Sequence, residues 1–145
     1  HYRKMRDAFF KDSFIKELLP ISELQKPFYN TGTPFTYSGM NFELPCKNLY
    51  DGYMASLNYG WDLKKTKATS QEGFIQSVKF FSYHRQGVFY TNNSKSDSKH
   101  IIVGVSEVNL RVFHVLMDAG NDHNNFWKDG KEAMNYLAFR RYMLK

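Results

Sequence analysis

Apolar and polar residues alternate most regularly in the second half of the chain. Residues 101–108 and 110–117 carry an apolar side chain at every second position, which is the period of a strand with one buried face. Residues 74–83 and 87–91 alternate in the same way, with a short polar turn between them. This pattern predicts meander-like antiparallel strands within residues 74–117.

The two ends of the chain show helical spacing instead. Apolar side chains recur every three or four positions over residues 2–19, and Pro20 ends the pattern. Residues 131–144 repeat this spacing, with Arg140 and Arg141 in the last turns, where cations suit the helix dipole. We therefore predict an N-terminal and a C-terminal helix.

The region between the first helix and the strands is harder to assign. Prolines and glycines divide residues 21–48 into short pieces, and we expect an irregular segment with short strands at 33–37 and 40–44. Residues 48–57 are ambiguous, and a short helix is our interpretation. Residues 63–73 are polar and basic, which is typical of a loop.

Together these elements predict an α+β fold, with an antiparallel sheet flanked by the N-terminal and C-terminal helices. A mostly β sandwich with peripheral helices is the alternative. The length suits a single domain over residues 1–145, built around 13 Phe, 10 Tyr and 2 Trp residues. Because the chain starts at His1, we expect a fragment or a processed product of a longer protein.

Cysteine content and hydropathy bear on the compartment. The single cysteine, Cys46, cannot form an internal disulfide, which favours an intracellular, reducing compartment, either cytoplasmic or organellar. No apolar run approaches the roughly 20 residues that a membrane span needs, so we expect no membrane span.

Charge indicates an anionic partner. The chain has 20 basic and 14 acidic residues, a net charge of +6 and a pI near 9.3, which favours nucleic acid or an acidic protein surface as the partner. The residues we expect to bind this partner are Lys64, Lys65, Lys67, Lys79, Arg85, Arg140 and Arg141.

Aromatic residues interleave with some of these cations. Lys79, Phe81, Tyr83 and Arg85 fall on the same side of a predicted strand. Aromatic platforms with cations are how sheets hold single-stranded nucleic acid. A buried core face is the alternative interpretation of the same pattern.

Candidate chemistry is sparse. His84, Arg85 and His100 could supply general acid–base catalysis of RNA cleavage, which needs a base, an acid and a cation. Candidate metal ligands follow the last predicted strand, at Asp118, Asp122 and His123. Their spacing matches neither a calcium loop nor a zinc signature, so no metal and no cofactor is expected.

Three hypotheses of function follow from the sequence. The leading one is a non-enzymatic binding or assembly module that docks on an anionic partner, with protein neighbours in a large nucleoprotein assembly. The second is a small nucleic-acid-directed enzyme of the RNase or toxin type that uses histidine chemistry. The third is a structural subunit buried among protein neighbours.

Overall fold

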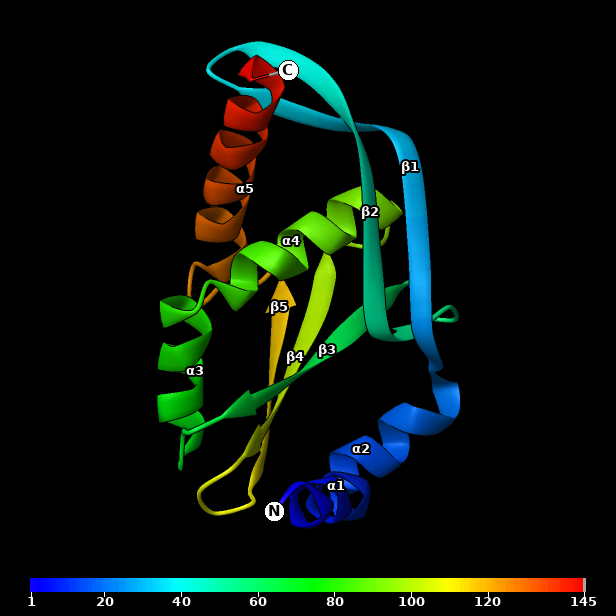
Figure 1. Ribbon diagram of the computed structural model, residues 1–145, viewed down its shortest axis with the longest axis vertical. Coiled ribbons are helices and arrows are strands. Elements are labelled where there is room, and N and C mark those ends of the chain that lie inside the picture. The colour runs from blue at the N-terminus through cyan, green and yellow to red at the C-terminus, as the bar shows by residue number, and fades with distance from the viewer. Residues whose placement is uncertain (145) are drawn as a thin grey trace.

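A sheet of five strands organises the computed structural model, which describes residues 1–144 (Figure 1). The strands follow one another in space as they do along the chain: β1 (Glu23–Tyr37), β2 (Met40–Met54), β3 (Tyr59–Thr66), β4 (Lys99–Ser106) and β5 (Val112–Asp118). All neighbouring strands are antiparallel except β3 and β4, which are parallel. A parallel pair needs a long crossover, and here two helices provide it.

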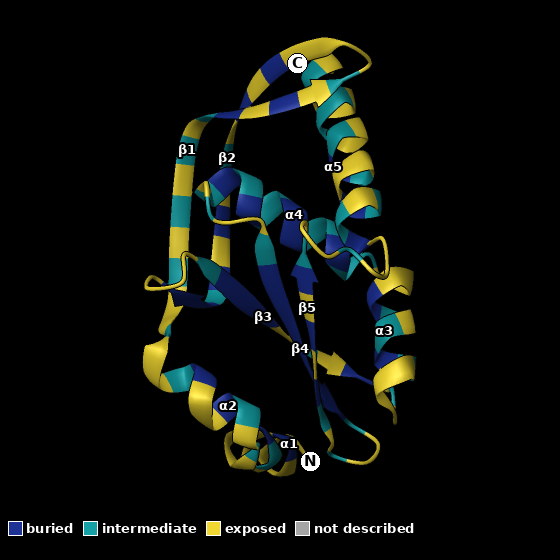
Figure 2. Ribbon diagram, turned by 180° about the vertical axis from the view of Figure 1, so that it is seen from behind, coloured by how far each residue is buried: buried dark blue, intermediate teal, exposed yellow. Residues whose placement is uncertain are grey.

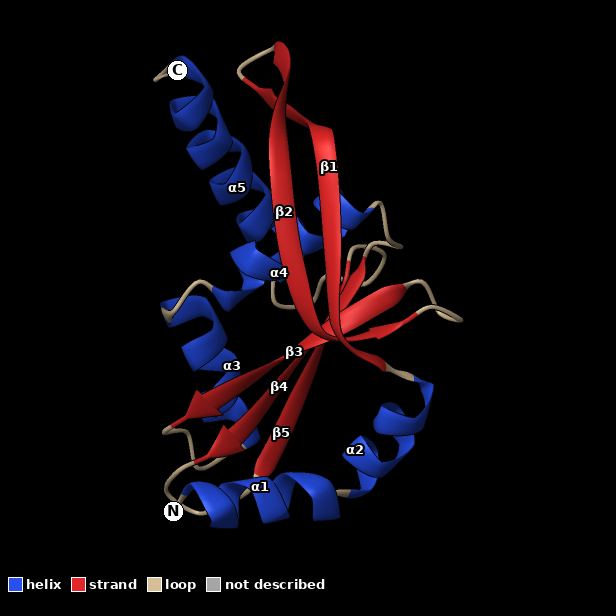
Figure 3. Cartoon of the chain, turned by 45° about the vertical axis from the view of Figure 1, so that its right-hand side comes forward, coloured by secondary structure: helices blue, strands red, loops and turns tan. Residues whose placement is uncertain are grey.

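Helices cover both faces of this sheet (Figure 3). One face packs against α1 (Tyr2–Lys11) and α2 (Ser13–Leu18), which a short 3-10 turn, η1 (Leu19–Ile21), connects to β1. The other face packs against the crossover helices α3 (Gln71–Phe80) and α4 (Tyr83–Ser94) and the closing helix α5 (Phe126–Met143). No helix within residues 1–144 is long and apolar enough to cross a membrane.

The centre of the sheet is buried on both sides, as Figure 2 shows for β4. Ile101 and Val103 point to the α1–α2 side, whereas Ile102 points to the α3–α5 side. Such double burial explains why β4 reads as a nearly continuous apolar run in the sequence.

The first two strands form a long hairpin whose tip extends beyond the other strands (Figure 1). That tip arches over the C-terminal end of α5, where aromatic rings hold the two together. Tyr37 packs against Tyr136 and Phe139, and Phe42 packs against Phe139 and Tyr142. The hairpin and α5 therefore form two walls on the same side of the sheet.

The predicted α+β fold is confirmed, with helices flanking a mostly antiparallel sheet. The N-terminal helix is present as α1 and α2, and the C-terminal helix as α5. The two clearest predicted strands are β4 and β5, joined as a hairpin. The strands within residues 1–144 form a single sheet, so the alternative of a β sandwich is wrong.

The predicted strands at residues 74–83 and 87–91 are wrong, because these residues lie in α3, in α4 and in the turn between the two helices. The apolar residues fit a helix equally well: Phe74 and Val78 are one turn apart and both fully buried. Ser70 caps α3 by accepting a hydrogen bond from the backbone of Gly73. Burial of one helical face therefore outweighs the strand-like alternation of the aromatics.

Three further assignments need correction. Residues 21–48 are mostly two long strands rather than an irregular segment, although the strands expected at 33–37 and 40–44 are present. Residues 48–54 continue β2 and residues 55–57 lie in a turn, so no helix forms there, and the loop expected at 63–73 begins only after β3. The prolines misled the prediction, because Pro is tolerated on an edge strand such as β1.

Candidate active site

Two aspartates meet where β2 and β3 begin to separate. The paired residues Gly52 and Trp61 are the last of the β2–β3 register on this side, and Asp51 and Asp62 are the next residues on each strand. A Cβ atom on Gly52 would lie 2.2 Å from the Trp61 ring, so only glycine permits this close approach. A hydrogen bond of 2.6 Å from the Leu63 N–H to Asp51 Oδ2 ties the strands together.

Asp62 is a buried carboxylate with an oxygen that lacks a hydrogen-bond partner within residues 1–144. Its side chain lies under α4, and the residue is 3% exposed. Its Oδ2 lies 3.4 Å from Nε2 of His100, yet neither this oxygen nor either His100 ring nitrogen has a hydrogen-bond partner within residues 1–144. Buried polar atoms in native proteins nearly always have partners, so such a group requires an explanation such as an ion or a ligand.

Asp51 occupies a less buried position beside it. Burial raises the pKa of the Asp51 carboxyl, and the negative charge of Asp62 raises it further. The hydrogen bond from Leu63, the charge of Lys64 and a hydrogen bond from the Gln25 side chain oppose this shift. A carboxyl group whose pKa is raised by a neighbouring negative charge is a favourable setting for a cation, which would relieve that repulsion.

Lys64 adds a positive charge to the same side of β3. It lies two residues after Asp62, and strand geometry directs side chains at i and i+2 to one face. Its Nζ donates a hydrogen bond to Oε1 of Gln86 and lies 4.8 Å from the centre of the Tyr83 ring. Two contacts from α4 thus hold the ammonium group in position.

Helix α4 covers the site. Gln86 and Tyr90 are one turn apart, and Nε2 of Gln86 donates to the Tyr90 hydroxyl over 2.8 Å. Burial raises the pKa of Tyr90, and the charge of Asp62 raises it further, so the phenol stays protonated at neutral pH. A Cβ on Gly87 would lie 2.6 Å from Cδ2 of His100, so the helix packs directly on the ring.

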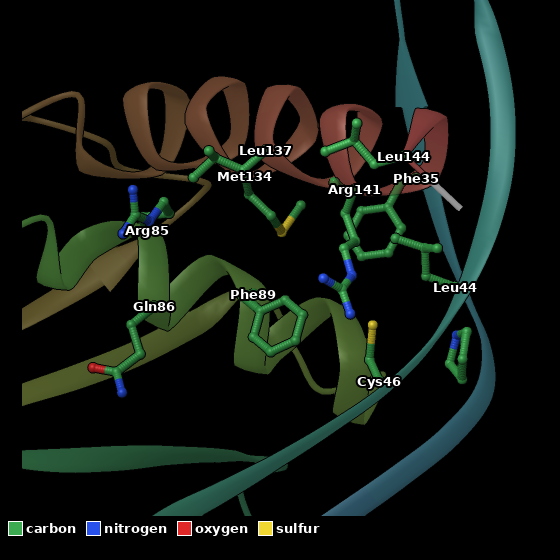
Figure 4. Close-up of a pocket in the computed structure, with 12 residues that line it drawn as sticks. Phe35, Leu44, Cys46, Arg85, Gln86, Phe89, Met134, Leu137, Arg141 and Leu144 are labelled. Atoms are coloured by element: carbon green, nitrogen blue, oxygen red, sulfur yellow. The ribbon is translucent and has the colours of Figure 1, made fainter.

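A cleft of about 630 Å³ adjoins this cluster, between α4, α5 and the β1–β2 hairpin. Its walls are mainly apolar, and Gln86 belongs both to the cleft and to the cluster around Lys64. Figure 4 shows Arg141 reaching from α5 into the space between Phe89 and Cys46, while Arg85 lies at the far end beside Gln86. The cleft therefore combines apolar walls with two guanidinium groups.

The basic residues predicted to bind an anionic partner do not share one surface. Only Lys64 joins the aspartates, because its neighbour Lys65 projects to the opposite face and pairs with Glu107 at 3.5 Å. Lys67 is exposed beyond the end of β3. Lys79 pairs with Asp129 at 3.4 Å and Arg140 lies over the Tyr136 ring, whereas Arg85 and Arg141 line the cleft.

The two candidate catalytic histidines are both buried. His100 is 0% exposed and contacts Asp62, whereas His84 packs against the Phe126 ring, with Nδ1 3.4 Å from the Val78 carbonyl oxygen. Burial lowers the pKa of His84, which keeps its ring neutral at pH 7. The role of either histidine as a general base remains a prediction.

The candidate metal ligands after β5 take part in local structure. Asp118 accepts a hydrogen bond from the Gly120 N–H, and both carboxylate oxygens of Asp122 accept N–H groups in the first turn of α5. His123 is exposed in the same loop. Within residues 1–144, no three or more His, Cys, Asp or Glu side chains are grouped to hold a metal ion.

Sequence reasoning missed three residues of the cluster around Lys64, namely Asp51, Asp62 and Gln86. An Asp-x-Lys run in a strand would have placed both charges on one face, but residues 63–73 were assigned to a loop. Likewise, Gln86 and Tyr90 have helical spacing that a strand assignment hides. In both cases, the correct secondary structure would have indicated that these side chains lie on the same face.

No protein-family model and no curated protein matches the sequence. Among solved structures, a phage-related exonuclease from Haemophilus somnus 129PT is similar over 98% of this chain and 71% of its own, with a TM-score of 0.50 and 13% identity. The crystal structure of SSO0001 is similar over 86% of this chain, with a TM-score of 0.46 and 12% identity. This chain spans 54% of the length of SSO0001. At such low identity, the likeness to the exonuclease shows the fold alone.

Proposed function

We propose that the protein is a metal-dependent nuclease, with Asp51, Asp62 and Lys64 forming the site that hydrolyses phosphodiester bonds. The observation that carries this proposal is the buried Oδ2 of Asp62, which has no hydrogen-bond partner within residues 1–144 and lies 3.4 Å from Nε2 of His100, near a second carboxylate and a fixed ammonium group. Two acidic ligands and a cation around one point suit a phosphate that reacts there. Nucleic acid therefore stays the expected partner, but the protein would be an enzyme and not the binding module expected from the sequence.

The donor set fits a small, hard divalent cation such as Mg²⁺. Mg²⁺ prefers oxygen ligands and commonly uses only one or two carboxylates, completing its shell with water and substrate phosphate. Asp51 and Asp62 would hold it, which agrees with the finding that residues 1–144 contain no larger cluster of ligands. When bound, such an ion supplies Lewis-acid polarisation of the phosphate and lowers the pKa of water.

The remaining side chains position and stabilise charge. Lys64 can donate hydrogen bonds to a phosphate oxygen, whose negative charge grows during hydrolysis. Gln86 fixes the Lys64 ammonium through its side-chain oxygen, and Tyr90 in turn accepts a hydrogen bond from the Gln86 amide. Because the Tyr90 phenol stays protonated, it remains a neutral donor close to the two carboxylates.

Two independent facts support a nucleic-acid substrate. The fold is shared with a protein named as a phage-related exonuclease, which makes nuclease chemistry a reasonable class for this scaffold. The net charge of +6 favours association with polyanions. The burial of His84 and His100 weighs against the RNase-type alternative, because a general base must reach its substrate.

The experiment is incubation of the purified chain with end-labelled DNA and RNA, in Mg²⁺ and in EDTA. We expect cleavage in Mg²⁺ and none in EDTA. Asp62→Asn should lower the rate by at least about a hundredfold, since even outer-sphere changes at metal sites cost about 10–100-fold. Asp118→Asn is the matched control, because the Asp118 carboxylate accepts a hydrogen bond from the Gly120 N–H in its own turn, away from the two aspartates.

Three results would contradict the proposal. Cleavage that persists in EDTA would exclude a metal at the two aspartates. Equal rates in wild-type protein and Asp62→Asn would exclude the site, provided that circular dichroism shows both proteins folded. Absence of cleavage from all DNA and RNA substrates, with binding retained, would restore the binding module predicted from the sequence.

A further inference from the structure

Two phenylalanine rings stand in solvent at the junction of α3 and α4. Phe80 is 81% exposed and Phe81 is 58% exposed, and their rings form an edge-to-face pair with centroids 4.9 Å apart. Ser82 adopts a left-handed conformation, with φ of 58°, and turns the chain between the two helices. An exposed pair of large apolar rings gains nothing for the core and is typical of an interaction site.

The rings lead directly to the proposed active site. Phe81 stacks on Tyr83, with centroids 5.6 Å apart and ring planes inclined by 22°. The ring of Tyr83 in turn lies 4.8 Å from Nζ of Lys64, which is hydrogen-bonded to Gln86. A continuous series of aromatic faces therefore runs from open solvent to the cation beside the carboxylates.

We propose that Phe80, Phe81 and Tyr83 form a stacking platform for unpaired bases of a single-stranded nucleic acid. The platform selects single strands, or frayed ends, as the substrate class of the neighbouring site. In this respect the inference rests on the proposed nuclease function. Stacking on aromatic rings is independent of base identity, whereas the bases of an intact duplex are stacked on one another and cannot reach a surface ring.

Charge around the platform suits a phosphate backbone. Lys64 lies at its inner end, with Nζ 4.8 Å from the centre of the Tyr83 ring. Cations beside aromatic platforms are the usual means of holding a single strand, because they track the phosphates while the rings take the bases. The strand pattern that suggested such a platform in the sequence was wrong, but three of its four residues, Phe81, Tyr83 and Arg85, lie at this helix junction.

A second copy of the chain is the competing occupant, and two observations weigh against it. A stable protein interface usually buries roughly 800 Å² on each partner, whereas two Phe side chains offer about 150–250 Å² each. In addition, each copy carries a net charge of +6, which opposes self-association. A nucleic-acid strand gains from both the rings and the charge.

The test is binding of a fluorescent single-stranded oligonucleotide, followed by anisotropy in EDTA so that hydrolysis plays no part. The double variant Phe80→Ala/Phe81→Ala should bind the single strand at least about tenfold more weakly, since each stacked base contributes about 1–3 kcal/mol. Its affinity for a blunt duplex should be unchanged. The double variant Phe80→Tyr/Phe81→Tyr keeps both rings and should bind like the wild type.

Tyr29→Ala is the matched control, because this ring is 78% exposed on β1 and belongs to another part of the surface. Unchanged single-strand affinity in the double alanine variant would overturn the proposal, as would an equal loss for the duplex. Sedimentation that shows a wild-type dimer dissociated by the same variant would assign the rings to self-association and overturn it too.

The design separates this inference from the proposed function. Binding in EDTA requires no metal, so Asp62→Asn should retain the preference for single strands although its cleavage rate is strongly reduced. Ring-dependent binding without any cleavage would refute the nuclease and keep the platform. Cleavage by a protein whose binding does not depend on the two rings would refute the platform and keep the nuclease.

Discussion

Lys64 and Lys65 are neighbours in the sequence, but they belong to different parts of the molecule. Lys64 lies under α4, where Gln86 holds its ammonium group close to the two aspartates. Lys65 projects to the opposite face of β3, where it pairs with Glu107 and lies over the Tyr2 ring. The first lysine is directed at a buried carboxylate cluster, and the second is an ordinary surface cation.

The difference follows from strand geometry. Successive side chains on a strand point to opposite faces, so a run of adjacent lysines is divided between two surfaces. A charge cluster counted along the sequence therefore overstates the charge on either surface. What distinguishes Lys64 is its position two residues after Asp62, which gives both the same side of the sheet.

Exchanging the two lysines for alanine is the most direct test of this comparison. Lys64→Ala should lower the cleavage rate by about 10²–10³-fold, the usual cost of removing one group that stabilises transition-state charge. Lys65→Ala should cleave like the wild type, because its exposed ion pair contributes little. Rates under single-turnover conditions give the measurement, and equal losses in both variants would refute the distinction.

A smaller effect is expected when the support of Lys64 is removed. Gln86→Leu leaves the ammonium without its acceptor, and we expect a loss of about 10–100-fold, typical of residues that orient a reacting group. The loss should appear in kcat and not in KM, and Gln86→Glu should restore part of it. Gln71→Leu on α3 is the control, since the Gln71 side chain donates a hydrogen bond to the His114 carbonyl oxygen, away from Lys64.

The close packing of α4 on this face predicts a stability effect. In Gly87→Ala, the new Cβ would lie 2.6 Å from the His100 ring, so helix and strand must move apart. We expect the free energy of unfolding to fall by about 1–3 kcal/mol, the usual cost of overpacking a core. Gly120→Ala, in an exposed loop, should change it by less than about 0.5 kcal/mol. Urea denaturation of both variants decides the matter.

The smallest effect concerns the pH dependence of stability. Because burial lowers the pKa of His84, the unfolded chain takes up a proton more readily than the native chain. The stabilisation is complete above the ordinary pKa of 6.5 and is lost as the pH falls below it, toward the lowered folded value. His84→Gln should therefore show a shallower decline of unfolding free energy between neutral and mildly acidic pH. An identical decline would mean that other groups control it.

Much of the fold could be predicted from local patterns. Strand β4 is a nearly continuous run of β-branched and apolar residues, β5 alternates regularly, and both terminal helices have clear helical spacing. These elements bury a face that the sequence specifies by itself. In contrast, the residues of α3 and α4 carry aromatics in positions that suit a strand or a helix, and only packing on the sheet decides between them.

The site could not be predicted because it depends on register. Asp51 and Asp62 are eleven positions apart, and only the pairing of Gly52 with Trp61 brings them together. Gln86 reaches Lys64 only if residues 83–94 form a helix above β3. His100 was considered as a catalytic residue, but its partner Asp62 was not, since nothing in the sequence indicates that the two are in contact.

The prolines of β1 affect how the protein associates with other chains in solution. This strand forms one edge of the sheet within residues 1–144, and an open edge is a template on which another chain can add a strand. Pro27 and Pro34 have no N–H group to offer, and the register shift between Asn30 and Thr33 interrupts the line of the edge. The residues that concealed the strand from prediction thus also protect it from aggregation.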